Sequence, residues 1–304
     1  MSWTKVVAIT GCDSGLGWAI AARAAREGLV TIAGMYNGSD TEAARALKNL
    51  CAHPYKLDVT DSKSVTEFQN YVKNVLQENP KYKLYAVVNN AGVMTVGNYE
   101  WQTPQMIENM INVNLLGAMR VVSSFLPELR KNGAINDFKP RIINVASHCG
   151  LQALPCFGPY SASKAGLLAW TRALHLEHFR DGLSVISFIP GGFIGSSNLT
   201  MNQVENGNKM LSHLTEEQKS IYEKRIRTLN KYLGQASNNT RYDSLSNEVI
   251  IETFVKALID NKPKQVYKVE PWRYKFYYNL LKMPFPDIMY YWIIKKFLAF
   301  PDSE

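Results

Sequence analysis

Two side chains four residues apart, Tyr160 and Lys164, are the strongest candidates for acid–base chemistry in this chain. The apolar run that follows, residues 165–170, is typical of a helix. Four residues span roughly one helical turn, so the phenol and the ammonium share a face. A fixed cation beside a phenol favours the phenolate, and we expect it to lower the tyrosine pKa from its usual value of about 10. Such a tyrosine can act as a general acid or base near neutral pH.

Ser147 is the next candidate, because it follows an apolar run, residues 142–146, that is typical of a buried strand. A residue directly after such a strand lies at the carboxyl edge of an open α/β sheet, where ligands bind. His148, beside it, either contacts a substrate or faces solvent. A Tyr-x-x-x-Lys pair is also common on exposed helix faces, so its interpretation depends on the motifs that precede it.

A glycine-rich turn near the start of the chain predicts a dinucleotide site. The apolar run 4–10 is followed by Gly11, Gly15 and Gly17, and then by an alanine-rich helical segment, residues 18–27. Glycines let the backbone turn sharply and approach a ligand closely, and the helix N-terminus offers N–H groups to a pyrophosphate. The spacing is Gly-x-x-x-Gly-x-Gly rather than the more familiar Gly-x-Gly-x-x-Gly.

Strands and helices alternate along the chain beyond this turn. The expected strands are 29–33, 55–57, 84–88, 141–146, 184–189 and 265–267, and the expected helices are 41–50, 62–77, 104–130, 158–180, 216–233 and 247–259. Strands alternating with helices of this length predict a parallel, doubly wound α/β sheet with right-handed crossovers. We expect one Rossmann-type domain over residues 1–270, followed by an extension over residues 271–304.

The composition is that of a globular protein from a reducing compartment. Apolar residues make up 46% and charged residues 20% of the chain, which argues against disorder. The four cysteines form no Cys-x-x-Cys pair, so we expect free thiols and no metal site. The net charge of +8 comes without a nucleic-acid motif, and we expect no nucleic-acid partner. We see no secretory signal and no apolar run of about 18 residues, and expect an intracellular protein that is not secreted.

Six motifs, in this order and at these intervals, resemble the short-chain dehydrogenase/reductase family. They are Thr10–Gly17, Asn89–Gly92, Asn114, Ser147, Tyr160–Lys164 and Pro190-Gly191. The resemblance spans residues 4 to about 195. The opening Thr-Gly-Cys-Asp-Ser-Gly is most similar to the branch that holds retinol dehydrogenases, 17β- and 11β-hydroxysteroid dehydrogenases and 3-hydroxybutyrate dehydrogenase. Residues 262–267 and the aromatic, basic stretch after them are similar to the C-terminal segment of that branch.

The resemblance implies a catalytic set of four residues. Tyr160 would exchange the hydroxyl proton while hydride moves to or from the nicotinamide. Lys164 would lower the tyrosine pKa and hold the nicotinamide ribose, and Ser147 would hydrogen-bond the substrate oxygen. Asn114 would distort its helix and hold a water that links Lys164 to solvent. His175 and His178 would lie on a helix face that the family uses for dimer contacts, so we expect no metal there.

The resemblance also implies a nicotinamide dinucleotide. The positions that match the family's cofactor contacts are Gly11, Ser14, Gly15, Leu16, Gly17, Asp58, Val59, Asn89, Ala91, Gly92, Tyr160, Lys164, Pro190 and Gly191. NAD-preferring members often end strand two with an acidic residue, whereas NADP-preferring members carry arginine there or just before the second glycine. Here Tyr36 and Asn37 follow strand two and Ser14 precedes Gly15, so neither signature is present. The lack of a cation for a 2′-phosphate, with the habit of the branch, favours NAD over NADP.

The segment after Pro190 matches the family's mobile substrate lid, which we place at about residues 193–240. Phe193 is a candidate substrate contact, with ordinary lid packing as the alternative. Gly195 stands where the family often has a threonine that contacts the nicotinamide. In the extension, aromatic and aliphatic residues interleave with lysine and arginine, which suits a peripheral membrane contact through 271–300. The alternative is a tail that covers the substrate pocket or makes a subunit contact.

The leading hypothesis is an NAD(P)-dependent oxidoreductase that interconverts an alcohol and its carbonyl on a hydrophobic, steroid- or retinoid-like substrate. A catalytically weak, cofactor-bound regulator and a dehydrogenase of a small hydroxy acid are the alternatives. For the hydroxy acid, residues 193–215 offer only Lys209 and His213 to meet a carboxylate. The family resemblance implies a homodimer or homotetramer, either cytoplasmic or attached to the face of an intracellular membrane.

Overall fold

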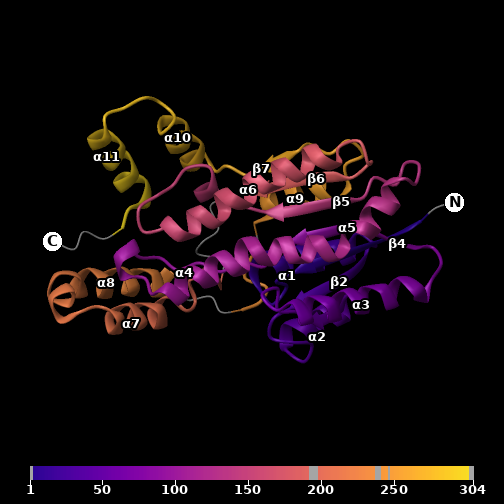
Figure 1. Ribbon diagram of the computed structural model, residues 1–304, viewed down its shortest axis with the longest axis horizontal. Coiled ribbons are helices and arrows are strands. Elements are labelled where there is room, and N and C mark those ends of the chain that lie inside the picture. Colours follow the sequence, from indigo (N-terminus) through magenta and orange to yellow (C-terminus); the bar gives the residue numbers. More distant parts are fainter. Residues whose placement is uncertain (1–2, 192–197, 237–240, 246, 301–304) are drawn as a thin grey trace.

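The computed structural model describes residues 3–191, 198–236, 241–245 and 247–300, and in it seven strands form one parallel sheet. The strand order is β3-β2-β1-β4-β5-β6-β7 (Figure 1). The strands are β1 (Thr4–Thr10), β2 (Val30–Met35), β3 (His53–Lys56), β4 (Tyr82–Asn89), β5 (Arg141–Val145), β6 (Ser184–Ile189) and β7 (Val266–Lys268). This order confirms the predicted doubly wound α/β fold.

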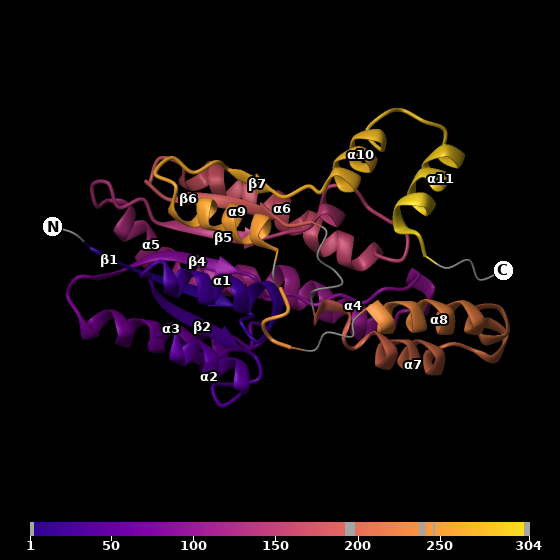
Figure 2. The same cartoon turned by 180° about the vertical axis from the view of Figure 1, so that it is seen from behind.

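Helices cover both faces of the sheet, and each face has its own apolar core (Figures 1 and 2). Helices α1 (Gly15–Arg26), α2 (Glu42–Asn49) and α9 (Glu248–Ile259) pack on one face. Helices α3 (Ser62–Glu78), α5 (Ala118–Gly133) and α6 (Gly158–His178) contribute to the other. The strands between them are buried on both sides, which explains why they read as unbroken apolar runs rather than alternating ones.

Helix starts follow local capping chemistry. The Thr41 hydroxyl accepts a hydrogen bond from the Ala44 N–H at 3.2 Å at the start of α2. Asp61 accepts from the Lys63 and Ser64 N–H groups at the start of α3. Such caps satisfy amide donors that have no partner within the helix. They place the helix starts within a residue or two of where the sequence predicts them.

The helix expected over 104–130 is not uniform. It consists of α4 (Pro104–Ile111), a π-helical stretch (Asn112–Gly117) and α5. By length and composition, residues Pro104–Gly133 form the one described helix long and apolar enough to cross a membrane. Core helices of soluble proteins pass the same test, and α5 packs here against β4 and α3. The π-helical stretch matches the expected distortion around Asn114.

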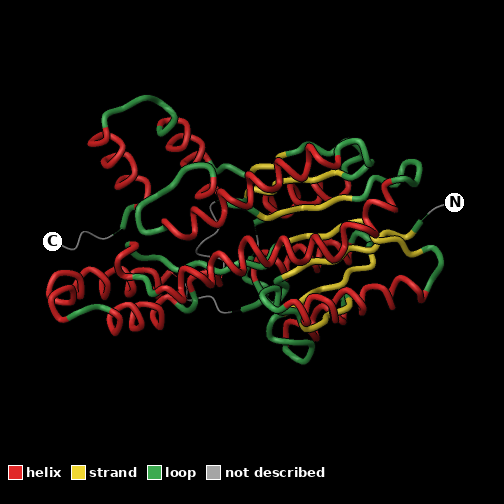
Figure 3. The backbone as a smooth tube through the Cα atoms, in the orientation of Figure 1, coloured by secondary structure: helices red, strands yellow, loops and turns green. Residues whose placement is uncertain are grey.

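A third apolar cluster lies beyond the carboxyl edge of the sheet, where the molecule consists only of helices and loops (Figure 3). It is built from α4, α7 (Gln203–His213), α8 (Glu216–Ala236), α10 (Trp272–Leu280) and α11 (Asp287–Leu298), together with residues before α6. The sequence predicts α8, but it does not predict α7, whose polar residues look like a loop. The C-terminal extension folds into a hairpin of two helices, α10 and α11, packed on this cluster.

Replacing Gly17 with alanine should destabilise the fold at the dinucleotide turn. A Cβ at Gly17 would overlap the carbonyl oxygen of Gly11, which is backbone and has no room to yield. We expect the free energy of unfolding to fall by about 3 kcal/mol, in the upper range for overpacked sites. The measurement is urea denaturation followed by circular dichroism.

The matched control is Gly158→Ala, because a Cβ at that glycine meets no atom within 4 Å. Its free energy of unfolding should change by less than about 1 kcal/mol. Equal losses in the two variants would contradict the steric explanation.

Candidate active site

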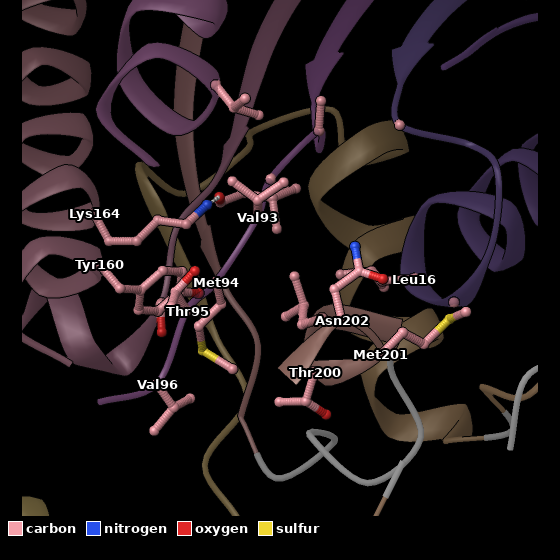
Figure 4. Close-up of a pocket in the computed structure, with 18 of the residues that line it drawn as sticks. Leu16, Val93, Met94, Thr95, Val96, Tyr160, Lys164, Thr200, Met201 and Asn202 are labelled. Atoms are coloured by element: carbon pink, nitrogen blue, oxygen red, sulfur yellow. Dashed lines mark hydrogen bonds between the residues drawn. The ribbon is translucent and has the colours of Figure 1, made fainter. Parts of the chain in front are cut away.

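A cavity of about 1650 Å³ opens at the carboxyl edge of the sheet. One side is formed by α6, which carries Tyr160 and Lys164, and the facing side by Leu16, Met201 and Asn202 (Figure 4). Nearly all of the sequence-predicted site residues line it: Gly11, Ser14, Gly15, Leu16, Gly17, Asp58, Val59, Ala91, Gly92, Ser147, His148, Tyr160, Lys164, Pro190 and Gly191. Phe193 and Gly195 lie outside the described residues.

Tyr160, Lys164 and Ser147 meet at this edge. The Lys164 ammonium lies 5.9 Å from the centre of the Tyr160 ring and donates a hydrogen bond to the Val145 carbonyl at 2.9 Å. Ser147 follows β5, and its side chain hydrogen-bonds the Tyr160 hydroxyl and accepts from the Cys149 N–H at 3.2 Å. Both side chains are deeply buried, with Tyr160 5% and Lys164 4% exposed.

The pKa of Tyr160 is raised in the structure, whereas the sequence led us to expect that it would be lowered. Burial raises the pKa of Tyr160 above its usual value, and the hydrogen bond from Ser147 only partly offsets that rise. Burial also lowers the pKa of Lys164 to about 8, and the interaction with Cys149 only partly offsets that fall. Loss of hydration therefore outweighs the favourable charge of an ammonium almost 6 Å from the ring.

Asn114 does not line the cavity; it supports the segment that does. Its Oδ1 accepts from the Val93 N–H at 2.8 Å, and its Nδ2 donates to the Val93 carbonyl at 2.9 Å and to the Ser163 hydroxyl at 3.0 Å. The side chain thus joins the loop after β4 to α6. A Cβ at Gly92 would lie 3.3 Å from Asn114 Oδ1 and 3.5 Å from Lys164 Nζ, so both polar groups approach the backbone there.

The glycine turn is held by side chains from the end of β4. Asn90 Nδ2 donates to the carbonyls of Thr10 and Gly11 at 3.1 and 2.9 Å, and the Thr10 hydroxyl accepts from the Asn90 N–H. Asn89, expected to pass along the adenosine ribose, instead points into the sheet and donates to Asn144 Oδ1 at 2.8 Å. Successive side chains of a strand face opposite sides, so it is Asn90 that reaches the cavity.

The groups around this turn fit a dinucleotide. The N-terminus of α1 and three glycines line the cavity, where amide donors suit a pyrophosphate. Asp58 lines it further along, with one carboxylate oxygen accepting from the N–H and the hydroxyl of Thr60. At the other end lie Pro190 and Gly191, beside Ser147. The residues present would therefore hold a nicotinamide dinucleotide along the carboxyl edge.

His148 lines the cavity but does not face solvent, which corrects the second of the two sequence interpretations. It is 2% exposed, and its Nδ1 lies 3.2 Å from the Pro190 carbonyl. Its ring meets the edges of Tyr274 and Tyr278 at centroid distances of 5.0 and 5.2 Å. Its Nε2 is 3.5 Å from the Glu270 carboxylate, an electrostatic contact rather than a short hydrogen bond. His148 therefore joins the loop after β5 to α10.

The half of the cavity beyond Tyr160 is apolar and aromatic, and the C-terminal hairpin forms part of its wall. The sequence did not identify these hairpin residues as pocket residues, because nothing in their spacing shows which helix face meets the body. The apolar residues lining this half include Met94, Leu154, Phe157, Leu199, Met201, Leu233, Tyr274, Tyr278, Phe297 and Phe300. Residues of both hairpin helices thus line this part of the cavity.

Comparison with known proteins gives consistent matches. The sequence model of the family described as short chain dehydrogenase matches residues 5–207. Retinol dehydrogenase 7 of Mus musculus is 31% identical over 293 residues, 95% of this chain and 88% of that protein. Mitochondrial D-beta-hydroxybutyrate dehydrogenase of Bos taurus is 30% identical over 249 residues, 78% of this chain and 70% of that protein.

Solved structures show the same likeness. A short-chain dehydrogenase from Streptomyces avermitilis superposes with a TM-score of 0.55 at 28% identity, covering 62% of this chain and 67% of that one. An alcohol dehydrogenase from Thermococcus sibiricus, complexed with 5-hydroxy-NADP, superposes with a TM-score of 0.53 at 26% identity, covering 62% of this chain and 77% of that one.

Replacing His148 with alanine should loosen the hairpin. The variant leaves a void between Tyr274 and Tyr278 and removes the partner of the Pro190 carbonyl. We expect a loss of about 2–4 kcal/mol in unfolding free energy and faster amide hydrogen exchange in α10. The control is His178→Ala at the end of α6, which removes another histidine contact, the one with Asp181 at 2.7 Å, and should leave amide exchange in α10 unchanged. Unchanged exchange in α10 of the His148 variant would contradict the proposed joint.

Proposed function

The chain belongs to the short-chain dehydrogenase family, and from that premise we propose that it interconverts a hydrophobic alcohol and its carbonyl compound. The observation that carries this proposal is the convergence of Ser147, Tyr160 and Lys164 in the cavity that the dinucleotide turn also lines, beside an aromatic pocket. Members of the family are oxidoreductases, and its nicotinamide cofactor supplies the hydride acceptor or donor. The substrate class, the residue roles and the cofactor preference are proposals.

In the proposed mechanism Tyr160 exchanges the hydroxyl proton. For oxidation, the Tyr160 phenolate takes the proton of the substrate hydroxyl while hydride leaves the carbinol carbon. Ser147 hydrogen-bonds the substrate oxygen as its charge changes. Lys164 would hold the nicotinamide ribose near the ring and favour the phenolate, and Asn114 would hold a water that links Lys164 to solvent, so that the proton taken up by Tyr160 can leave. Reduction runs the same steps backwards, with the neutral phenol as the acid.

The aromatic pocket supports a lipophilic substrate. Its wall joins residues of α10 and α11 to those before α6, and such surfaces bind apolar molecules by excluding water. A small hydroxy acid is the second candidate, because Lys209 and Arg273 also line the cavity. Lys209 is paired with Glu205 at 2.7 Å, and Arg273 donates to two carbonyls of α11, so both cations already have partners. A retinoid and steroid panel run beside 3-hydroxybutyrate separates the two.

The preferred cofactor is proposed to be NAD. Three carboxylates, those of Asp13, Glu42 and Asp58, line the part of the cavity near the ends of β2 and β3. Their charge opposes an additional phosphate on the adenosine ribose. A cofactor-bound regulator with weak chemistry is the remaining alternative, and it would bind NADH without oxidising any alcohol of the panel.

The variant Tyr160→Phe should lose turnover and keep the cofactor. Loss of the acid–base group should lower kcat by about 100-fold or more. The dissociation constant for NADH, measured by fluorescence titration, should stay within about threefold because the hydroxyl is one contact among many. In the unsubstituted protein, alcohol oxidation should rise with pH, since burial raises the pKa of Tyr160 and the phenolate is scarce at neutral pH.

Tyr222→Phe is the control, because the exposed Tyr222 hydroxyl donates to Glu100 on the lid side, away from Ser147. It should retain full activity. Retained turnover in Tyr160→Phe would end the acid–base assignment. So would a residual alcohol oxidation in Tyr160→Phe that depends on pH in the same way as that of the unsubstituted protein.

We also propose that the outer face of the hairpin lies on an intracellular membrane. Trp272, Phe276 and Met283 follow one face of α10 and its continuation, and Ile288 and Trp292 one face of α11; all are at least half exposed. Lysines 275, 282, 295 and 296 surround them. Aromatic residues beside lysines suit the interface between lipid headgroups and acyl chains. The inner face of the same helices lines the pocket, so a lipophilic substrate would reach it from the bilayer.

Vesicle flotation tests this contact. Trp272→Ser combined with Trp292→Ser should weaken binding to anionic phospholipid vesicles by about tenfold or more, since each buried tryptophan contributes on the order of 1.5–3 kcal/mol. Phe179→Ser removes an equally exposed aromatic residue at the far end of α6 and should leave binding unchanged. Failure of the unsubstituted protein to float would dismiss the membrane proposal without touching the enzymatic one.

A further inference from the structure

A loop from far along the chain packs against the dinucleotide turn. Within residues 241–245, the Tyr242 carbonyl accepts a hydrogen bond from the Gly15 N–H at 2.9 Å, and its ring meets that of Trp18 at a centroid distance of 4.9 Å. Leu245 is buried in the core beneath α1. These contacts attach the loop firmly to the first turn of α1.

The loop faces the end of β2, which Asp13 holds in place. The two carboxylate oxygens of Asp13 accept from the N–H groups of Tyr36 and Asn37, both at 2.8 Å. In sheets of this topology the residues at the end of β2 read the 2′ position of the adenosine ribose. The Asp13 bonds therefore fix the backbone at that reading position, and they add a negative charge beside it.

Arg241 brings a cation to the same region. It lines the cavity together with Asp13, Tyr36 and Glu42, and the Glu42 carboxylate at the start of α2 attracts it. Its guanidinium is already bound by Asp243 through two parallel hydrogen bonds, Nε to Oδ1 and Nη2 to Oδ2, both 2.9 Å long. The bidentate geometry is the one that a phosphate would use. The carboxylate of Asp243 thus occupies the donors that would bind a 2′-phosphate.

We propose that Asp243 is a specificity-determining residue that selects NAD over NADP by occupying Arg241. This inference rests on the proposed function. A 2′-phosphate would have to displace Asp243 from Arg241 and approach Asp13, Glu42 and Asp58, whereas a 2′-hydroxyl has neither requirement. Asp243 acts through Arg241 and needs no contact with the cofactor itself.

The test is fluorescence titration of the purified protein with NADH and NADPH. Asp243→Asn frees the guanidinium, and the affinity for NADPH relative to NADH should rise about threefold to fivefold, in line with an exposed charge pair. The gain should shrink at high salt. The double variant Arg241→Gln with Asp243→Asn should lose the gain, and Arg241→Gln alone should lower the relative affinity for NADPH, because Asp243 then stands unpaired.

Glu223→Gln is the matched control, since it frees Arg227 from an exposed pair on α8, where Nη2 and Oε1 are 2.6 Å apart. It should leave the ratio unchanged, and thermal unfolding of each variant checks that the fold is kept. An unchanged ratio in Asp243→Asn overturns this inference and leaves the proposed function intact. An unsubstituted protein that prefers NADPH overturns both this inference and the proposed NAD preference, but leaves the proposed interconversion of alcohol and carbonyl intact. An unsubstituted protein that binds neither nucleotide overturns the proposed function and this inference together.

Discussion

The close approach of β1 and β4 at the dinucleotide turn is the constraint on which the rest of the site depends. A Cβ at Gly11 would lie 2.7 Å from the Ala91 Cα, and the φ of Gly11 is +69°, so a side chain is excluded on two grounds. Thr10 and Asn90 tie the two strand ends with hydrogen bonds. Because the loops after β4 and β5 and helix α6 are placed relative to these ends, the contact also sets the position of Tyr160.

Burial governs the electrostatics of the acid–base pair. Tyr160 and Lys164 are withdrawn from water with no carboxylate among the hydrogen-bond partners described for them, so each is biased toward its neutral form. A lysine pKa of about 8 leaves that amine able to gain or lose a proton near physiological pH. The pair is therefore better described as a neutral phenol beside an amine that can still release its proton than as a phenolate held by a permanent cation.

The C-terminal hairpin of α10 and α11 has two different faces. One face lines the apolar pocket through Tyr274, Tyr278 and Phe297, and His148, the residue next to Ser147, joins that face to Pro190. The other face exposes large apolar residues between lysines. The same two helices therefore contribute both to the pocket wall and to an exposed apolar surface.

Local patterns in the sequence determined the sheet, its flanking helices and the residues that follow the strands, because apolar runs, caps and glycines act over a few residues. Since parallel strands end at a common edge, the same patterns also placed Ser147, Tyr160, Lys164 and the glycine turn together. Long-range packing decided the rest. Which of Asn89 and Asn90 reaches the cavity depends on strand pleat, and the burial that raises the Tyr160 pKa depends on helices contributed by the last third of the chain. Arg241 and Asp243 reach the end of β2 only because α9 packs beside α1, a contact between segments more than 200 residues apart that no local spacing encodes.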